Sequence, residues 1–434
     1  MAATAQPSDK PVIGILSLGE MGTGIAKLLL AHDYEVATCT QGRSKYTLRR
    51  IQEANIKAYD TDSKFVAEVD VLLSIVPPRD ATATAVRMLE ASRNVDAIKR
   101  RKERLAEATS DTNLIYIDCN AISAKTSRNI AAFFVPQEGS SEDLSRSGSG
   151  SRPGSQSSSA PAPPPRRFSL ARLLSSDAPT TAEPGSLAGP SAPIKIVYLD
   201  GGIIGSPPSQ TKTATNSADK TNNNTNTSPS SSKTPGPSTQ PSPSEWKRPS
   251  LVLSGPSITT LLPSSLLTTL NATAISPTIG AASTLKSCFA ATTKGLTALL
   301  TLSLATASQS HVLPHLLSHL ETYAPQLLTA AQGSMPTMPP KAYRWVEEMR
   351  QIGSTFATEG GLECGETVFG GVAELYRFVS EDTVLGKERT ESRKRGRTAE
   401  DVAACVAEGV REKRKKAEKA DEVGGKLVWR GSWD

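Results

Sequence analysis

The sequence is poor in aromatic residues, in paired cysteines and in long apolar runs. Phe, Trp and Tyr make up 5% of the 434 residues, and the five cysteines show no C-x-x-C spacing. Neither a disulfide framework nor a cysteine zinc site is therefore expected, and free thiols in a reducing compartment fit better. The longest apolar region, 296–307, is interrupted by Thr and Ser and is shorter than the ~20 residues of a membrane-spanning helix. No basic segment with an apolar run behind it opens the chain, so a cytoplasmic protein without membrane contact is expected.

Two stretches lack the apolar residues of a core. Residues 138–194 are rich in Ser, Pro, Gly and Ala, and residues 206–246 consist mostly of Ser, Thr, Asn, Pro and Lys. Such compositions cannot offset the entropy of ordering a chain, so both are predicted to be disordered insertions.

The net charge of +6 comes largely from a basic tail over 386–434. Its runs of Lys and Arg are typical of a nuclear localisation signal or a nucleic-acid-binding patch, but glutamates are interleaved with them. This mixture favours the solvated face of a helix. Nucleic-acid binding is not expected, and a nuclear location stays open beside the cytoplasmic one.

Strand and helix patterns alternate through the first part of the chain. Apolar strand candidates are 12–18, 35–40, 71–76, 114–119, 195–200 and 250–254, and helical patterns cover 21–31, 45–54, 81–108 and 125–134. This alternation predicts an α/β fold with a doubly wound parallel sheet at 10–275, interrupted by the two insertions. Three- and four-residue apolar steps over 285–302 and 342–356 predict an all-α second domain at 276–385, followed by the tail.

The first strand runs into a turn punctuated by glycine and then into a helix. Gly19 would let the backbone approach a pyrophosphate, and Gly22 would let the helix pack closely on the strand. Ser17 stands where the G-x-G-x-x-G fingerprint has its first glycine. The pattern predicts a dinucleotide-binding corner of Rossmann type, with a tight turn that binds nothing as the alternative.

The segments after the second and third strand candidates carry further cofactor candidates. Arg43, followed by Ser44, stands where an acidic residue would accept the ribose 2′-OH of NAD, whereas an arginine matches a 2′-phosphate. Arg43 therefore favours NADP over NAD, although an ordinary solvated loop arginine is the alternative. Val76 and Pro77 could pack against the adenine or nicotinamide side, but prolines also end strands for local reasons.

Substrate candidates follow the next two strands. Asn120 and Ser123 could hold a substrate carboxylate or hydroxyl, and Ser123 could equally cap the helix that begins near 125. Gly202 and Gly205, after the strand at 195–200, permit close approach of the backbone to a ligand, with simple turn formation as the alternative.

Lys286 is the candidate for acid–base chemistry. It lies between Leu285 and Phe289 in a nearly uncharged apolar stretch. It either extends its amine to water or is partly desolvated, which would lower its pKa toward a range useful for proton transfer. Lys294 follows eight residues later, about 12 Å along a helix axis.

A metal site is not predicted. His311, His315 and His319 recur at four-residue steps, but no cysteine or supporting carboxylate pattern accompanies them and Pro314 interrupts the run.

In this order the motifs resemble those of the β-hydroxyacid dehydrogenases, which include 3-hydroxyisobutyrate and 6-phosphogluconate dehydrogenases. The family's G-x-G-x-M-G is matched by residues 18–22, with Ser17 in place of its first glycine, and Glu20 and Met21 complete the cofactor turn. Its D-x-S-T-x-x-P motif is answered by 118–124, its glycine-rich segment by 200–206, and its catalytic lysine by Lys286. The sequence is most similar to the branch of this family that has a 6-phosphogluconate dehydrogenase-like C-terminal helical domain.

The resemblance implies hydride transfer between NADP and a small hydroxy or oxo acid, with Lys286 as general acid/base and a homodimer built through the helical domain. Ala290 stands where the family has an asparagine one turn after the lysine, and Asn120 and Ala124 also depart from its motif. The familiar hydroxy acids are therefore not assumed as substrates. The lysine argues against an imine reductase. A catalytically inactive NADP-binding protein that acts through partner contacts is the competing hypothesis.

Overall fold

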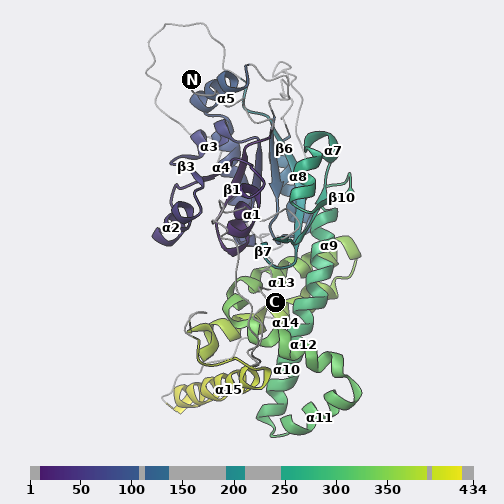
Figure 1. The fold of residues 1–434 in the computed structure, drawn as a ribbon. Helices are drawn as coiled ribbons and strands as arrows, with labels where there is room; N and C mark the ends of the chain where they lie inside the picture. Colours follow the sequence, from purple (N-terminus) through teal and green to yellow (C-terminus); the bar gives the residue numbers. More distant parts are fainter. Residues whose placement is uncertain (1–9, 107–112, 136–191, 211–245, 389–392, 423–434) are drawn as a thin grey trace, which may run out of the picture. The chain divides into compact units, whose positions relative to one another are not determined.

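The computed structural model describes residues 10–106, 113–135, 192–210, 246–388 and 393–422 (Figure 1). The predicted insertions 138–194 and 206–246 lie almost entirely outside these residues, so their disorder stays a prediction. The ends of the second insertion are described: β7 (Ser209–Gln210) pairs antiparallel with β8 (Trp246–Lys247). The chain on either side of 211–245 is thereby held together.

An eight-stranded sheet forms the first part of the fold, in the order β3-β2-β1-β4-β5-β6-β9-β10. The first six of these strands run parallel in the order of a dinucleotide-binding sheet, which confirms the Rossmann prediction. β9 runs antiparallel to β6 and β10 follows β9 in parallel, so the prediction of a wholly parallel sheet is wrong for this edge. The strands are β1 (Ile13–Leu16), β2 (Val36–Cys39), β3 (Lys57–Tyr59), β4 (Val71–Ser74), β5 (Leu114–Asp118), β6 (Ile196–Ile204), β9 (Ser250–Ser254) and β10 (Ala272–Ser276).

Helices cover both faces of this sheet, because both faces of its strands are apolar and each buries a separate hydrophobic cluster. The helices are α1 (Glu20–Leu30), α2 (Lys45–Glu53), α3 (Asp62–Glu68), α4 (Ala81–Ser92), α5 (Val95–Leu105), α6 (Ala124–Phe133), α7 (Ile258–Leu261) and α8 (Ser264–Thr269).

Two boundaries differ from the sequence prediction, and three further elements were not predicted. The helix predicted at 81–108 is two helices, because Asn94 leaves the helical path and its side chain caps α5 by accepting a hydrogen bond from the Ala97 amide at 3.0 Å. The strand predicted to end at 200 continues to Ile204, so Gly202 lies within β6 and only Gly205 lies in the turn after it. β3, α3 and β10 were not predicted.

The second part of the fold is helical, as predicted. It comprises α9 (Ala281–Ala290), a π-helical turn (Ala291–Gly295), α10 (Leu296–Gln309), α11 (Leu313–Tyr323), α12 (Pro325–Ser334), α13 (Pro339–Gly360), α14 (Cys364–Glu381) and α15 (Ala399–Glu422). Buried residues of α10, α13, α14 and α15 share one core. The segment treated as a tail therefore contributes α15 to this core, whereas its basic residues at 411–419 are exposed.

The apolar stripe predicted over 285–302 is helical but faces outward. Leu285, Phe289, Leu299 and Leu302 expose 42%, 48%, 61% and 46% of their surface. The core is filled instead by other positions of the same helices, such as Leu304. An exposed apolar stripe of this kind is typical of a face that meets another protein.

Among the described helices, the continuous segment Ala281–Gln309 has the length and mean hydropathy (1.3) of a membrane-spanning helix. The apolar region identified in the sequence, 296–307, covers only part of this helical segment, because α9, the π-turn and α10 continue without a break. A single helix of this kind is weak support for a membrane location, since core helices of other proteins pass the same test.

Candidate functional site

The glycine turn keeps its fingerprint geometry despite the missing first glycine. Ser17 adopts φ +75°, a left-handed conformation that L residues rarely take and that costs on the order of 1–3 kcal/mol. A Cβ at Gly22 would lie 2.2 Å from the Ser17 carbonyl oxygen, so only glycine fits there. A Cβ at Gly19 would meet no atom within 4 Å. The turn is thus closed on the protein side and open at Gly19, where an anion would approach.

Helix α1 begins at this turn without a side-chain cap. Gly19 is its N-cap residue and offers no capping hydrogen bond. The backbone amides of the first turn, which begins at Glu20, therefore remain available for an anion at the positive end of the helix. The Met21 side chain packs against the sheet core instead of pointing to a ligand.

Arg43 lies in the turn after β2, where the sequence placed it. Its amide closes the turn by donating to the Thr40 carbonyl at 3.1 Å, and its side chain is half-buried. No hydrogen bond or ion pair of its guanidinium is recorded within the described part of the chain. Ser44 caps α2 by accepting from the Thr47 amide at 3.3 Å, so its hydroxyl already has a structural role. The cofactor roles of both residues stay predictions.

Arg50 is a neighbour of the glycine turn that the sequence did not reveal. Its guanidinium donates to the Leu18 carbonyl at 3.3 Å and ties α2 to the turn. The two residues are 32 positions apart, and no local pattern marks such a contact.

A row of buried polar residues crosses four neighbouring strands at the same level. Ser74, Asp118, Asp200 and Ser254 are register partners on β4, β5, β6 and β9, and none of them is exposed to solvent. Polar groups are held at such positions only when hydrogen bonds or charges compensate their burial.

Asp200 anchors the N-terminus of α9. Its carboxylate accepts from the Ser254 hydroxyl, the Gly280 and Ser283 amides (3.0 Å each) and the Ser283 hydroxyl (2.6 Å). These four hydrogen bonds hold the carboxylate against the first turn of α9. Asp200 therefore fixes the helix that carries Lys286.

Asp118 is compensated less completely. One oxygen accepts from the Asn120 amide at 2.9 Å, and the other has no partner in the described structure. Burial, with the neighbouring Asp200 charge as a smaller contribution, raises the pKa of Asp118 to about 7. This carboxyl can therefore exchange a proton near neutral pH.

The Asn120 side chain joins the ends of β4 and β5. Its amide oxygen accepts from the Val76 amide at 2.7 Å, and its nitrogen donates to the Ser74 hydroxyl at 3.1 Å. The residue is buried. The structure thus gives Asn120 a positioning role, and its predicted substrate contact stays a prediction.

Ser123 is the N-cap of α6, the alternative that the sequence left open. Its hydroxyl accepts from the Thr126 amide at 3.1 Å. Its own amide donates at 2.9 Å to the side-chain oxygen of Gln351 on α13, a contact that was not predicted. Gln351 in turn donates to Glu347 at 2.9 Å, so α13 is connected to the end of β5.

Lys286 lies at the end of β5. Its Nζ donates to the Cys119 carbonyl at 3.1 Å, and desolvation lowers its pKa from 10.5. Gly202 explains how α9 comes so close: a Cβ there would lie 3.1 Å from the Ala282 carbonyl oxygen and 3.2 Å from the Lys286 Cβ. Gly205 lies beside Pro249 instead, so of the two predicted glycines only Gly202 contacts the lysine.

Lys294 and Glu348 form an ion pair near Lys286, with the Lys294 amine 5.1 Å from the centre of the Trp345 ring. In a regular helix Lys294 would be turned about 80° from Lys286. The π-turn at 291–295 carries one extra residue and reduces this angle. The two charges act on Lys286 in opposite directions, since Glu348 raises its pKa and Lys294 lowers it.

A cleft of about 280 Å³ lies beside the end of β4. Pro77 and Pro78 form one wall with Arg79, and residues of α13 and α14 form the other. The remaining lining residues are Tyr343, Arg344, Val346, Glu347, Arg350, Arg377 and Glu381.

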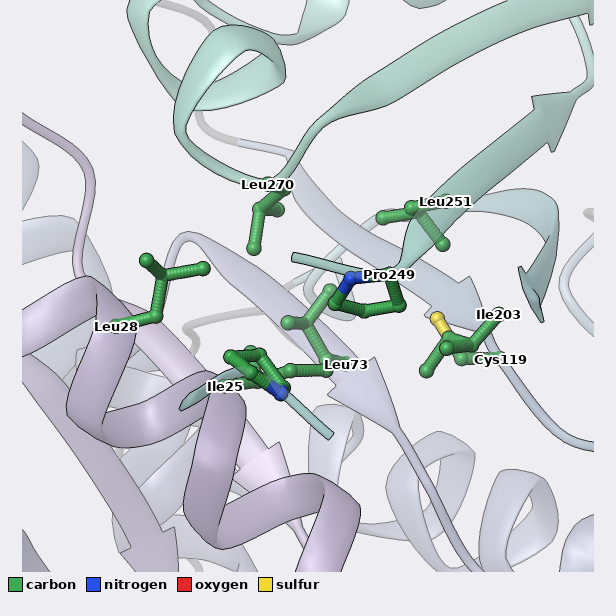
Figure 2. Close-up of a pocket in the computed structure, with 9 residues that line it drawn as sticks. Ile25, Leu28, Leu73, Cys119, Ile203, Pro249, Leu251 and Leu270 are labelled. Carbon is green, nitrogen blue, oxygen red and sulfur yellow. The ribbon is translucent and has the colours of Figure 1, made fainter. Parts of the chain in front are cut away.

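A second cavity is enclosed, apolar and only about 10 Å³ in volume (Figure 2). Figure 2 shows Ile25 and Leu28 of α1 on one side of it and Cys119, Ile203 and Leu251 on the other. This is the space of about one water molecule, so no cofactor or substrate is held there.

The three histidines do not meet as a group. α11 begins at Leu313, so Pro314 starts the helix instead of interrupting it, and His311 lies before the helix at φ +60°. No cluster of three His, Cys, Asp or Glu residues with metal-binding geometry occurs among the described residues.

Comparison with known proteins places two domain families on the chain. Residues 12–150 match the NAD-binding domain of 6-phosphogluconate dehydrogenase, and residues 307–379 match a domain of unknown function, DUF1932. No curated protein gives a significant match.

Similar solved structures include a conserved hypothetical protein from Sinorhizobium meliloti 1021 (16% identity, 93% of this chain and 97% of that chain, TM-score 0.48). They also include a 3-hydroxyisobutyrate dehydrogenase from Mycobacterium tuberculosis with L-serine (12% identity, 91% and 98%, 0.47). An imine reductase from Myxococcus stipitatus in complex with NADP+ shows 13% identity over 85% and 100%, with a TM-score of 0.38. These similarities are too remote to transfer an activity.

Proposed function

We propose that this chain, which has an NAD-binding domain of the 6-phosphogluconate dehydrogenase type at residues 12–150, is an NADP-dependent β-hydroxyacid dehydrogenase. The domain match agrees with the resemblance found in the sequence. The observation that carries the proposal is the partly desolvated amine of Lys286, held against the end of β5 with a lowered pKa. In a doubly wound sheet the reacting end of a dinucleotide lies at such strand ends.

NADP fits the residues present. The open turn at Gly19 and the uncapped first amides of α1 suit its pyrophosphate. Arg43, whose guanidinium pairs with none of the described side chains, suits its 2′-phosphate. When bound, NADP supplies the hydride acceptor or donor. The predicted path of the bound cofactor runs along the strand ends from β2 to β4. It is bordered by Ser44 after β2 and by Val76 and Pro77 after β4.

Lys286 performs the proton transfer. In oxidation its neutral amine accepts the substrate hydroxyl proton while the carbinol carbon loses hydride and becomes a carbonyl. In reduction its ammonium returns that proton to the oxygen. The Ser123 end of α6 borders the proposed space for the substrate, and Asn120 holds the two strand ends that frame it. Gly202 contributes indirectly, because its missing side chain lets α9 bring Lys286 close to β6.

A catalytically inactive NADP-binding protein is the second candidate. It is favoured by Ala290 in place of the family's asparagine and by the hydrogen bonds that both the oxygen and the nitrogen of the Asn120 side chain make inside the protein. Without these two groups a substrate would have fewer polar contacts.

The test is a screen for NADPH oxidation against small oxo acids and aldehydes, with NADP binding measured separately. We expect one or more oxo acids to be reduced. NADP binding without oxidation of NADPH by any compound would reject the dehydrogenase and favour the second candidate.

We further propose a homodimer that buries the exposed stripe of Leu285, Phe289, Leu299 and Leu302. These four side chains are exposed on α9 and α10, and they lose contact with water when a second copy covers them. The molar mass in solution should then be twice the 45.9 kDa of the chain, and a monomeric mass at micromolar concentration would exclude this assembly.

A further inference from the structure

The cleft beside β4 is lined by four arginines from three elements. Arg79 follows β4, Arg344 and Arg350 lie on α13, and Arg377 lies on α14. The carboxylates that line the cleft are Glu347 and Glu381, so positive charge exceeds negative charge. Arginines gathered around a cleft are typical of sites for carboxylate or phosphate groups.

The four arginines differ in how far their charge is already used. Arg377 has three carboxylates within 3.6 Å, and Arg350 has Glu347 and Glu374 at 3.6 and 3.5 Å. Among the carboxylates of the described residues, Arg79 approaches only Asp80, at 3.8 Å. For Arg344 no ion pair or hydrogen bond of the side chain is recorded in the described ranges. Arg344 and Arg79 therefore have donors to spare for a ligand.

Both walls of the cleft lead to the reacting end of the site. Glu347 is hydrogen-bonded to Gln351, which contacts the Ser123 amide. On the other wall, Pro77 follows Val76, whose amide donates to Asn120. Along α13, Arg344 lies about 10 Å from Gln351 at 1.5 Å per residue. An anion bound at Arg344 would therefore belong to a part of the substrate that is separated by several covalent bonds from the group that reacts at the end of β5.

We propose that the arginine cleft binds a second anionic group of the substrate, which makes the substrate a hydroxy or oxo acid with a distal carboxylate or phosphate. This inference rests on the proposed function for the identity of the reacting group. The cofactor's own phosphates are served by α1 and Arg43 at β1 and β2, so the cleft beside β4 remains for the substrate.

Binding of matched probes tests the proposal without requiring turnover. Isothermal titration of the full chain with NADP would compare 2-oxoglutarate with 2-oxopentanoate, and 6-phosphogluconate with gluconate. We expect the dianionic member of at least one pair to bind about 10-fold more tightly or better. Equal affinity within both pairs, or no measurable binding of any probe, would overturn the proposal.

Arg344→Gln should then remove most of that preference, and Arg79→Gln should act in the same direction. Arg93→Gln is the matched control, since this exposed arginine at the end of α4 lies outside the cleft and loses the same charge. A preference that survives both cleft variants would refute the site. Loss of NADP affinity in Arg344→Gln would instead assign the cleft to a cofactor phosphate and also refute it. A dehydrogenase screen without any turnover would contradict the proposed function but leave these binding results readable.

Discussion

Lys286→Ala is expected to lower NADP-linked turnover by about 10²–10⁴-fold while NADP affinity stays unchanged, because the variant removes the group that moves the substrate proton. The amine contacts the Cys119 carbonyl and no part of the predicted cofactor path. Steady-state turnover and cofactor titration would be measured on the same preparation. Lys125→Ala removes an exposed lysine near the same strand end and should leave turnover intact.

Lys286→Arg separates proton transfer from charge. An arginine keeps the positive charge but does not give up its proton at accessible pH, so it should be nearly as inactive as alanine. Wild-type turnover in Lys286→Ala would refute the assignment. Restored turnover in Lys286→Arg would show that only the charge matters.

The pH dependence of the wild type follows from the direction of the pKa shift. Oxidation needs the neutral amine, so its rate should rise with pH as Lys286 loses its proton, and reduction should fall over the same range. Since desolvation lowers the pKa of Lys286 from 10.5, the rise should be complete at lower pH than for an ordinary lysine. This limb of the profile should be absent in Lys286→Arg.

Local sequence signals were sufficient for the first half of the sheet. The strand, turn and helix at 12–31 are each encoded by neighbouring residues, and only one conformation lets Ser17 and Gly22 share the turn. The reversed direction of β9 could not be read in this way. Whether a strand pairs parallel or antiparallel depends on how the chain returns to the sheet, and the sequence of the strand itself does not record it.

Periodicity revealed the long helix of the second part of the chain but not its buried side. Leu285 and Phe289 begin a series of apolar residues at three- and four-residue steps, yet these two side chains are exposed. Ala298 and Leu304, which do not belong to that series, are buried. A spacing of three and four residues predicts that one face is apolar. It does not state whether that face meets the same chain or another one.

The sequence singled out candidate residues for chemistry but not the residues that contact them. Lys286 stood out because a lone lysine in an apolar stretch is unusual, and its catalytic role stays a prediction. Glu348 and Gln351 did not stand out, because their partners Lys294 and Ser123 are 54 and 228 positions away. Asn120 was chosen for its place after a strand, but its hydrogen bonds within the protein depend on two strands meeting.

Arg43→Glu should weaken NADP binding about 100-fold or more and leave NAD binding nearly unchanged. The variant loses a charge-assisted contact to the 2′-phosphate and places a carboxylate next to it. For NAD the same carboxylate meets a ribose hydroxyl, which it can accept as a hydrogen bond. The structural reason for this expectation is the half-buried Arg43 in the turn after β2, whose guanidinium has no ion pair with any described residue.

Dissociation constants for both cofactors, measured by fluorescence titration at fixed ionic strength, would give the ratio that matters. Arg49→Glu is the matched control, because it reverses the same charge on the exposed side of α2. It should weaken NADP only slightly, through the overall field that salt screens. If Arg43→Glu weakened NADP and NAD by equal factors, the loss would come from a distorted turn, and the 2′-phosphate role of Arg43 would be rejected. If only NADP is lost, the preference of this chain for NADP resides in one side chain at the end of β2.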